Sequence, residues 1–127
     1  MTKTMILALA GALLLGPCAA FAHGQAPQAT HGGQVQEAHE NWVELVVRGA
    51  DVKLYVLDEA RKPVPASRIS GTATVLVGGK PYKVQLDAAG GDALQATLPV
   101  AATGKTIATV SLKIDDQPAT ARFSFAS

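Results

Sequence analysis

Three histidines near the start of the chain are the residues best suited to chemistry. His23, His31 and His39 are eight residues apart, and Glu37 and Glu40 flank the last of them. That spacing does not place two ligands side by side on one helix or strand, so a shared site requires the segment to fold back on itself. Imidazole nitrogens and carboxylate oxygens suit Cu(II), Ni(II) or Zn(II). The pattern predicts a transition-metal site, with copper the first choice and zinc or nickel as alternatives.

The first 22 residues have the pattern of a cleaved export signal. Lys3 precedes an uncharged apolar run, Met5 to Leu15, which is too short to span a bilayer comfortably. Ala20-Phe21-Ala22 fits the small-x-small pattern that signal peptidase accepts. We therefore expect a periplasmic protein with no stable membrane anchor, cleaved after Ala22 or Ala20. A lipoprotein signal ending at Cys18 is the weaker alternative, because a proline stands directly before the cysteine.

Both cleavage sites would leave a chain terminus that can chelate copper. Cleavage after Ala22 makes His23 the first residue, so its amine and ring nitrogen bind one metal as a pair, and a second histidine completes the site. Cleavage after Ala20 leaves Phe-Ala-His, whose amine, two backbone amides and imidazole form the tetragonal site that Cu(II) and Ni(II) prefer. The alternative interpretation is that His23 is a solvated tail residue, and that His31 and His39 belong to ordinary turns.

Composition excludes several classes of function. Loss of the signal removes the only cysteine, so the mature chain has no disulfide and no thiol nucleophile. Ten Lys and Arg (eleven less Lys3) balance ten Asp and Glu, a balance that gives no indication of nucleic-acid binding. The sequence has no nucleophile elbow, and its Gly-Gly pairs read as hairpin turns rather than phosphate loops. We expect a binding protein rather than an enzyme.

The elements that must position these histidines are β-strands. Trp42–Val47 and Val52–Leu57 are apolar, β-branched runs joined by Arg48-Gly49-Ala50-Asp51, which predicts a β-hairpin. Alternate residues place Val43, Leu45 and Val47 on one face of the first strand, with Trp42, Glu44 and Val46 on the other. We expect the uniformly apolar face to lie in a core and the mixed face to lie outside it.

The rest of the chain repeats this pattern of short strands and turns. After an edge strand at Gln34–Ala38, with Val35 as its core residue, the later strands are expected at 72–77, 82–86, 93–98, 106–114 and around Phe123. A Pro63/Pro65 loop at 59–70 crosses between them. We therefore divide the chain into a signal (1–22), a flexible histidine-containing segment (23–33) and a β domain (34–127). The regular spacing predicts an all-β, Ig-like antiparallel sandwich of seven or eight strands, with a small barrel as the alternative.

Four short stretches resemble a known family. These are His31-Gly32-Gly33-x-Val35, Val43-Glu44-Leu45-Val46-Val47, Leu54-Tyr55-Val56-Leu57-Asp58 and Lys62-Pro63-Val64. Together they are similar to the N-terminal part of periplasmic adaptor (membrane-fusion) proteins of heavy-metal RND efflux pumps, and to small stand-alone periplasmic relatives. The resemblance covers roughly Thr30 to Val64 and implies a role in periplasmic metal handling.

A second likeness is to small Ig-like periplasmic copper-resistance proteins, whose mature chain begins with histidine. His23 would match that residue after cleavage at Ala22. Those proteins carry a further histidine late in the chain, whereas no histidine follows His39 here. The sequence therefore favours a periplasmic protein that binds or delivers a transition metal. The competing hypotheses are a metal-free module that docks on an efflux adaptor or other envelope protein, and, third, a copper-dependent oxidative enzyme.

Overall fold

The computed structural model describes residues 25–126, which form eight β-strands and one short 3-10 helix. The strands are β1 (Gln34–Ala38), β2 (Asn41–Arg48), β3 (Asp51–Leu57), β4 (Ile69–Val77), β5 (Lys80–Ala88), β6 (Ala93–Thr97), β7 (Thr106–Ile114) and β8 (Gln117–Phe125), and the helix η1 (Ala66–Arg68) precedes β4. Within residues 25–126, no helix has the length and apolar character needed to cross a membrane.

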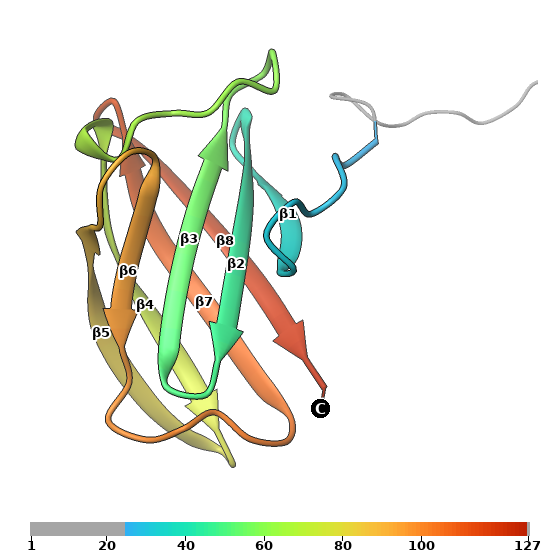
Figure 1. Ribbon diagram of the computed structural model, residues 1–127, viewed down its shortest axis with the longest axis vertical. Coiled ribbons are helices and arrows are strands. Elements are labelled where there is room, and N and C mark those ends of the chain that lie inside the picture. Colours follow the sequence, from blue (N-terminus) through green and yellow to red (C-terminus); the bar gives the residue numbers. More distant parts are fainter. Residues whose placement is uncertain (1–24, 127) are drawn as a thin grey trace, which may run out of the picture.

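All neighbouring strands are antiparallel, in the order β1-β2-β3-β6-β5-β4-β7-β8 (Figure 1). Strand β5 joins two halves, because it pairs with β4 along most of its length and reaches β6 only through Asp87 and Ala88. The halves β1-β2-β3-β6 and β5-β4-β7-β8 face each other across the core. Strands β1 and β8, at the two ends of this order, also lie side by side, so the folded sheet is nearly closed and barrel-like.

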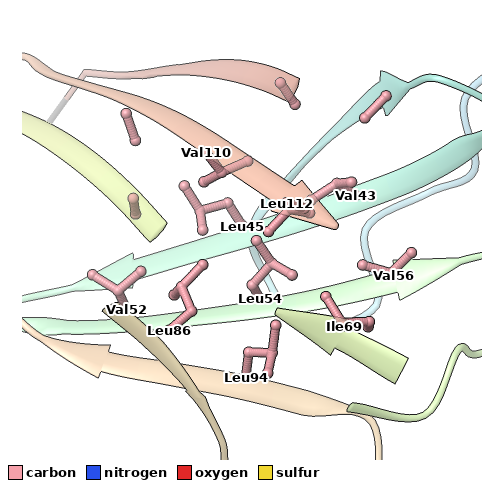
Figure 2. Close-up of a cluster of buried hydrophobic side chains, with 14 of the residues drawn as sticks. Val43, Leu45, Val52, Leu54, Val56, Ile69, Leu86, Leu94, Val110 and Leu112 are labelled. Atoms are coloured by element: carbon pink, nitrogen blue, oxygen red, sulfur yellow. The ribbon is translucent and has the colours of Figure 1, made fainter. Parts of the chain in front are cut away.

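The core lies between the two halves and consists of aliphatic side chains. In Figure 2, the labelled side chains of β2 and β3 point toward Val110 and Leu112 of β7. Phe123 of β8 is fully buried and is the largest side chain in this core. Alternation of apolar and polar residues produces this arrangement, since successive side chains of a strand point to opposite faces.

Strand β2 is buried on both of its faces. Its inward residues Val43 and Leu45 are fully buried, as the alternation predicts. Its outward residues Trp42, Glu44 and Val46 are only 6–7% exposed, although residues 25–126 form no second sheet over them. The N-terminal segment, residues 25–33, provides part of this cover, and its contacts with β2 form the candidate site.

The predicted all-β antiparallel fold is confirmed. The hairpin of β2 and β3 and the hairpin of β4 and β5 lie where the sequence pattern predicts strands. In the hairpin of β2 and β3, Trp42 lies opposite Leu57 and Arg48 lies opposite Asp51. The link between the two strands is therefore two residues long, Gly49-Ala50, because Arg48 and Asp51 of the expected four-residue link belong to the strands. The expected loop at 59–70 is shorter than predicted, because η1 and the start of β4 occupy its last residues. Val35 was expected in the core, but it lies half-buried opposite Glu44 on the outer face. Ala38 is the core residue of β1.

Candidate functional site

The candidate site is centred on Glu44, a carboxylate near the middle of β2 that is only 7% exposed. Its Oε2 accepts hydrogen bonds from the backbone N–H groups of His31 (2.9 Å) and Gly33 (3.0 Å). Its Oε1 lies 2.8 Å from Nδ1 of the His31 ring and 3.4 Å from the backbone nitrogen of Thr30. A buried carboxylate is stable only when such partners replace its hydration. Glu44 therefore holds the N-terminal segment against β2.

These contacts determine the ionisation of Glu44. Burial raises the pKa of Glu44, but the hydrogen bonds from the His31 ring and from the backbones of Gly33 and His31, together with the charge of His31, outweigh it. The net result is a pKa below the ordinary value. Each of these donors favours the charged form of the acid. Glu44 is thus an ionised acceptor at neutral pH.

The same contact defines the state of the His31 ring. A carboxylate only accepts hydrogen bonds, so we assign the proton of the neutral ring to Nδ1, where it faces Glu44. The lone pair then belongs to Nε2. This arrangement, a carboxylate hydrogen-bonded to one imidazole nitrogen, is the one that orients histidines whose other nitrogen binds a metal.

Tyr55 of β3 fixes the plane of the His31 ring. The two rings stack with centroids 3.6 Å apart and planes inclined by 3°. Tyr55 lies opposite Glu44 in the β2–β3 ladder, so adjacent strands place the stacking partner and the carboxylate side by side. The His31 side chain remains 43% exposed. A ring held on one face and at one nitrogen, yet open to solvent, can bind an ion without rearranging.

Two arginines add contacts to the N-terminal segment. The Nη2 of Arg48 donates to the carbonyl oxygen of His31 (3.3 Å), and the guanidinium of Arg61 donates to the carbonyl of Gln25. Arg61 also lies over the ring of Trp42, 5.9 Å from its centroid. A cavity of about 100 Å³ lies between the segment and the sheet, and both Trp42 and His31 line it. The only tryptophan of the chain is therefore next to the site.

Of the other predicted ligands, those within residues 25–126 lie at β1 and at the turn that follows it. His39 and Glu40 occupy the turn between β1 and β2, Glu37 lies on β1 opposite Trp42, and all three are exposed. His31 lies further along, beside the middle of β2. Among residues 25–126, no group of three or more His, Cys, Asp or Glu side chains is placed to hold a metal ion. His23 and the predicted cleavage positions Ala20 and Ala22 lie outside the described residues.

Sequence reasoning did not identify Glu44 and Tyr55 as partners of His31. The available signal was the position of Glu44, a single acidic residue within the apolar run Trp42–Val47. Acidic residues are rarely buried without a partner, so its location in a strand with apolar neighbours indicates a specific contact. The identity of that partner depends on the path of the N-terminal segment, which alternation along a strand does not determine.

Gly33 allows the segment to approach β2, and its replacement should be costly. A Cβ atom at this position would lie 2.2 Å from the carbonyl oxygen of Leu45, a clash with backbone that no side-chain rotation relieves. We expect Gly33→Ala to lower the free energy of unfolding by about 3 kcal/mol, at the upper end of overpacking costs. In the control Gly79→Ala, the Cβ meets no atom within 4 Å, and we expect only the cost of a left-handed backbone, about 1 kcal/mol. Urea unfolding of both variants measures the difference, and equal losses would contradict the close approach.

Comparisons with protein-family models, with curated proteins and with solved structures find no match to this chain. The main feature of the site is a solvent-accessible imidazole that a buried carboxylate and a tyrosine ring hold in one orientation.

Proposed function

We propose that this protein binds a transition metal, copper first, in the periplasm, and that His31 provides its anchoring nitrogen. The observation that carries the proposal is the 2.8 Å contact between His31 Nδ1 and the buried Glu44 carboxylate. It supports an Nε2 lone pair oriented for a metal, as carboxylates bound to the other nitrogen do for metal-binding histidines. Copper is preferred because Cu(II) is the most tightly bound of the divalent metals at nitrogen sites.

His23, eight residues before His31, is the principal ligand that the sequence suggests, with His31 and His39 as its partners, and we propose it here as the second ligand beside His31. As a mature N-terminal residue it would add an amine and an imidazole to the His31 nitrogen. The exposed residues His39, Glu37 and Glu40 lie near the start of β2, and we assign them at most an occasional role as ligands. Delivery of the bound metal to an efflux adaptor is the corresponding proposal for the partner.

Copper affinity of single variants tests this assignment. Competition against a chelator, followed through Trp42 fluorescence quenching by Cu(II), gives the dissociation constant. Loss of the hydrogen-bond partner of a metal-binding histidine weakens metal binding by about 10–100-fold. His31→Ala removes the ligand itself, so we expect it to weaken copper binding by at least that factor. The control is His39→Asn. The backbone at residue 39 is left-handed (φ 58°), a conformation that asparagine tolerates, so this variant should fold and bind copper as the parent does.

Two other results would redirect the proposal. If His23→Ala abolishes binding while His31→Ala leaves the affinity unchanged, the metal is held by the chain terminus, and the contact of His31 with Glu44 is purely structural. If neither variant changes the affinity, the proposal fails for both histidines. A parent protein that binds no copper at stoichiometric metal would also exclude it.

A metal-free docking module is the second candidate, and the unequal edge strands favour it. Strands β1 and β8 are at the two ends of the strand order, and β8 has nine residues against the five of β1. Part of the β8 edge therefore extends past β1, and exposed edges can pair with a strand of another protein. Pro118 lies near the start of this edge. A Thr120→Pro variant, which removes a further backbone donor from β8, would weaken such a complex while leaving copper binding unchanged.

A further inference from the structure

A groove lies on the outer face of β2 and β3, directly beside the stacked rings of His31 and Tyr55. It has a volume of about 370 Å³, and the residues that line it are His31, Val46, Arg48, Asp51, Lys53 and Tyr55. The strand register explains this lining, because Val46 lies opposite Lys53, and Arg48 lies opposite Asp51. The groove therefore continues from the proposed metal ligand along both strands.

Charge in this groove favours an anion beside the imidazole. The lining of the groove has two cations, Arg48 and Lys53, and one carboxylate, Asp51. Glu44 is a second carboxylate beside the ring, on its Nδ1 side, where donors of the N-terminal segment already bind it. The hydrogen bond from Arg48 to the backbone carbonyl of His31 (3.3 Å) holds its guanidinium at the backbone of this residue, and it uses one of the five N–H donors of an arginine. The guanidinium fork matches the two oxygens of a carboxylate. The cationic end of the groove is thus suited to a carboxylate.

Within residues 25–126, His31 belongs to no group of three side chains that could hold a metal. A metal on His31 would therefore take ligands from solution at the positions that the chain leaves open, and Arg48 and Lys53 favour a ligand that carries negative charge. Cu(II) prefers a tetragonal arrangement of nitrogen and oxygen ligands, and His31 Nε2 supplies one position. An α-amino acid supplies two adjacent positions, through its amine and one carboxylate oxygen. Its second carboxylate oxygen can then accept hydrogen bonds from Arg48 and Lys53.

We propose that His31 binds copper as a ternary complex with a small amino-carboxylate chelator, and that Arg48 and Lys53 hold the carboxylate of that chelator. The inference rests on the proposed function, because it takes His31 as the metal ligand. It defines the cargo as a copper chelate rather than the bare ion. It also assigns Arg48 and Lys53 a role in choosing which chelates bind.

Glycine is the probe for this ternary complex. The dissociation constant of the protein for Cu(II) is measured in a non-coordinating buffer, and that for the 1:1 Cu(II)–glycine complex in the same buffer. Electron paramagnetic resonance spectra are recorded with ¹⁴N-glycine and with ¹⁵N-glycine. Lys53→Gln and Arg48→Gln remove one charge each from the groove. Lys113→Gln removes the same charge from an exposed position on β7, in the other half of the fold.

The proposal predicts that the nitrogen hyperfine pattern of the bound copper changes with the glycine isotope. It also predicts that Lys53→Gln and Arg48→Gln weaken binding of the glycine complex by about threefold to tenfold, while Lys113→Gln has no effect. Identical spectra with both isotopes, or equal affinities of Lys53→Gln and Lys113→Gln for the glycine complex, would overturn it. Either of these two outcomes would overturn the ternary complex alone, because His31→Ala would still weaken Cu(II) binding in glycine-free buffer. If His31→Ala instead binds Cu(II) in glycine-free buffer as tightly as the parent does, the proposed function is overturned as well.

Discussion

Replacing Glu44 by glutamine should lower the free energy of unfolding by about 2–4 kcal/mol at neutral pH. The glutamine side chain keeps the size of Glu44 but loses its charge. One of the two carboxylate oxygens is replaced by an NH₂ group, which is a donor. The groups around it are also donors: the backbone N–H groups of the N-terminal segment and Nδ1 of His31. Hydrogen bonds to charged groups contribute about 1.5–3 kcal/mol each, and a donor left unpaired in a buried place adds a further cost.

The pH dependence of this loss has a defined sign. The pKa of Glu44 is lower in the folded chain than its ordinary value. At a pH between the folded and the unfolded pKa, the unfolded chain therefore binds more protons than the folded chain. The free energy of unfolding rises with pH in that interval. The stabilisation is complete above the unfolded pKa of about 4.3. It is lost as the pH falls through the folded pKa. The difference between the parent and Glu44→Gln should therefore narrow below about pH 4.3.

Urea unfolding from neutral pH down to about pH 3 measures both effects, since that range spans the ordinary pKa of a glutamate. Glu40→Gln is the matched control, because Glu40 is exposed in the turn that precedes β2. Surface substitutions of this kind change stability by about 0.5 kcal/mol or less. A Glu44→Gln loss as small as that of Glu40→Gln would show that the carboxylate does not hold the N-terminal segment.

Metal binding should raise the unfolding temperature of the parent protein and not that of His31→Ala. A ligand that binds only the folded state at about 100 times its dissociation constant stabilises that state by about 2.7 kcal/mol. For a domain of this size each kcal/mol corresponds to about 4–8 °C, so the expected rise is above 10 °C. Because the histidine must be unprotonated to bind, the rise should shrink as the pH falls.

Differential scanning calorimetry with Zn(II) gives this result without copper-driven oxidation. His39→Asn is the control, and it should show the full rise. An equal rise in the parent and in His31→Ala would mean that the stabilising metal binds elsewhere. No rise in the parent at saturating Zn(II) would exclude binding that depends on the folded state.

Strand positions were predictable because alternation is a local property of the sequence. The alternating residues of β7, Ala108, Val110, Leu112 and Ile114, are all buried as expected. The pairing of β3 with β6, and the path of β5 from one half to the other, depend on contacts between distant residues. No local pattern encodes them. Val35 was misplaced because a single apolar residue in a five-residue strand does not define which face is inward.

The site was predictable in part. His31 was a candidate from its residue type and its place near the predicted mature terminus. Its grouping with His39 was an inference from proximity in sequence; in the structure His39 lies in the turn between β1 and β2, whereas His31 contacts Glu44 near the middle of β2. The contact with Glu44 joins residues 13 positions apart, across the turn and pairing of β1 and β2. The close approach of Gly33 to Leu45 allows the segment to lie where these contacts form.

The central claim concerns one proton and one lone pair on the His31 ring, and nitrogen NMR of ring-labelled histidine observes both. The neutral His31 ring in the protein without metal should give the signals of the tautomer that is protonated at Nδ1, as the contact with Glu44 requires. Addition of Zn(II), which is diamagnetic, should then shift the Nε2 signal of His31 and leave Nδ1 protonated. The opposite tautomer, or ring signals that Zn(II) does not change, would contradict the account.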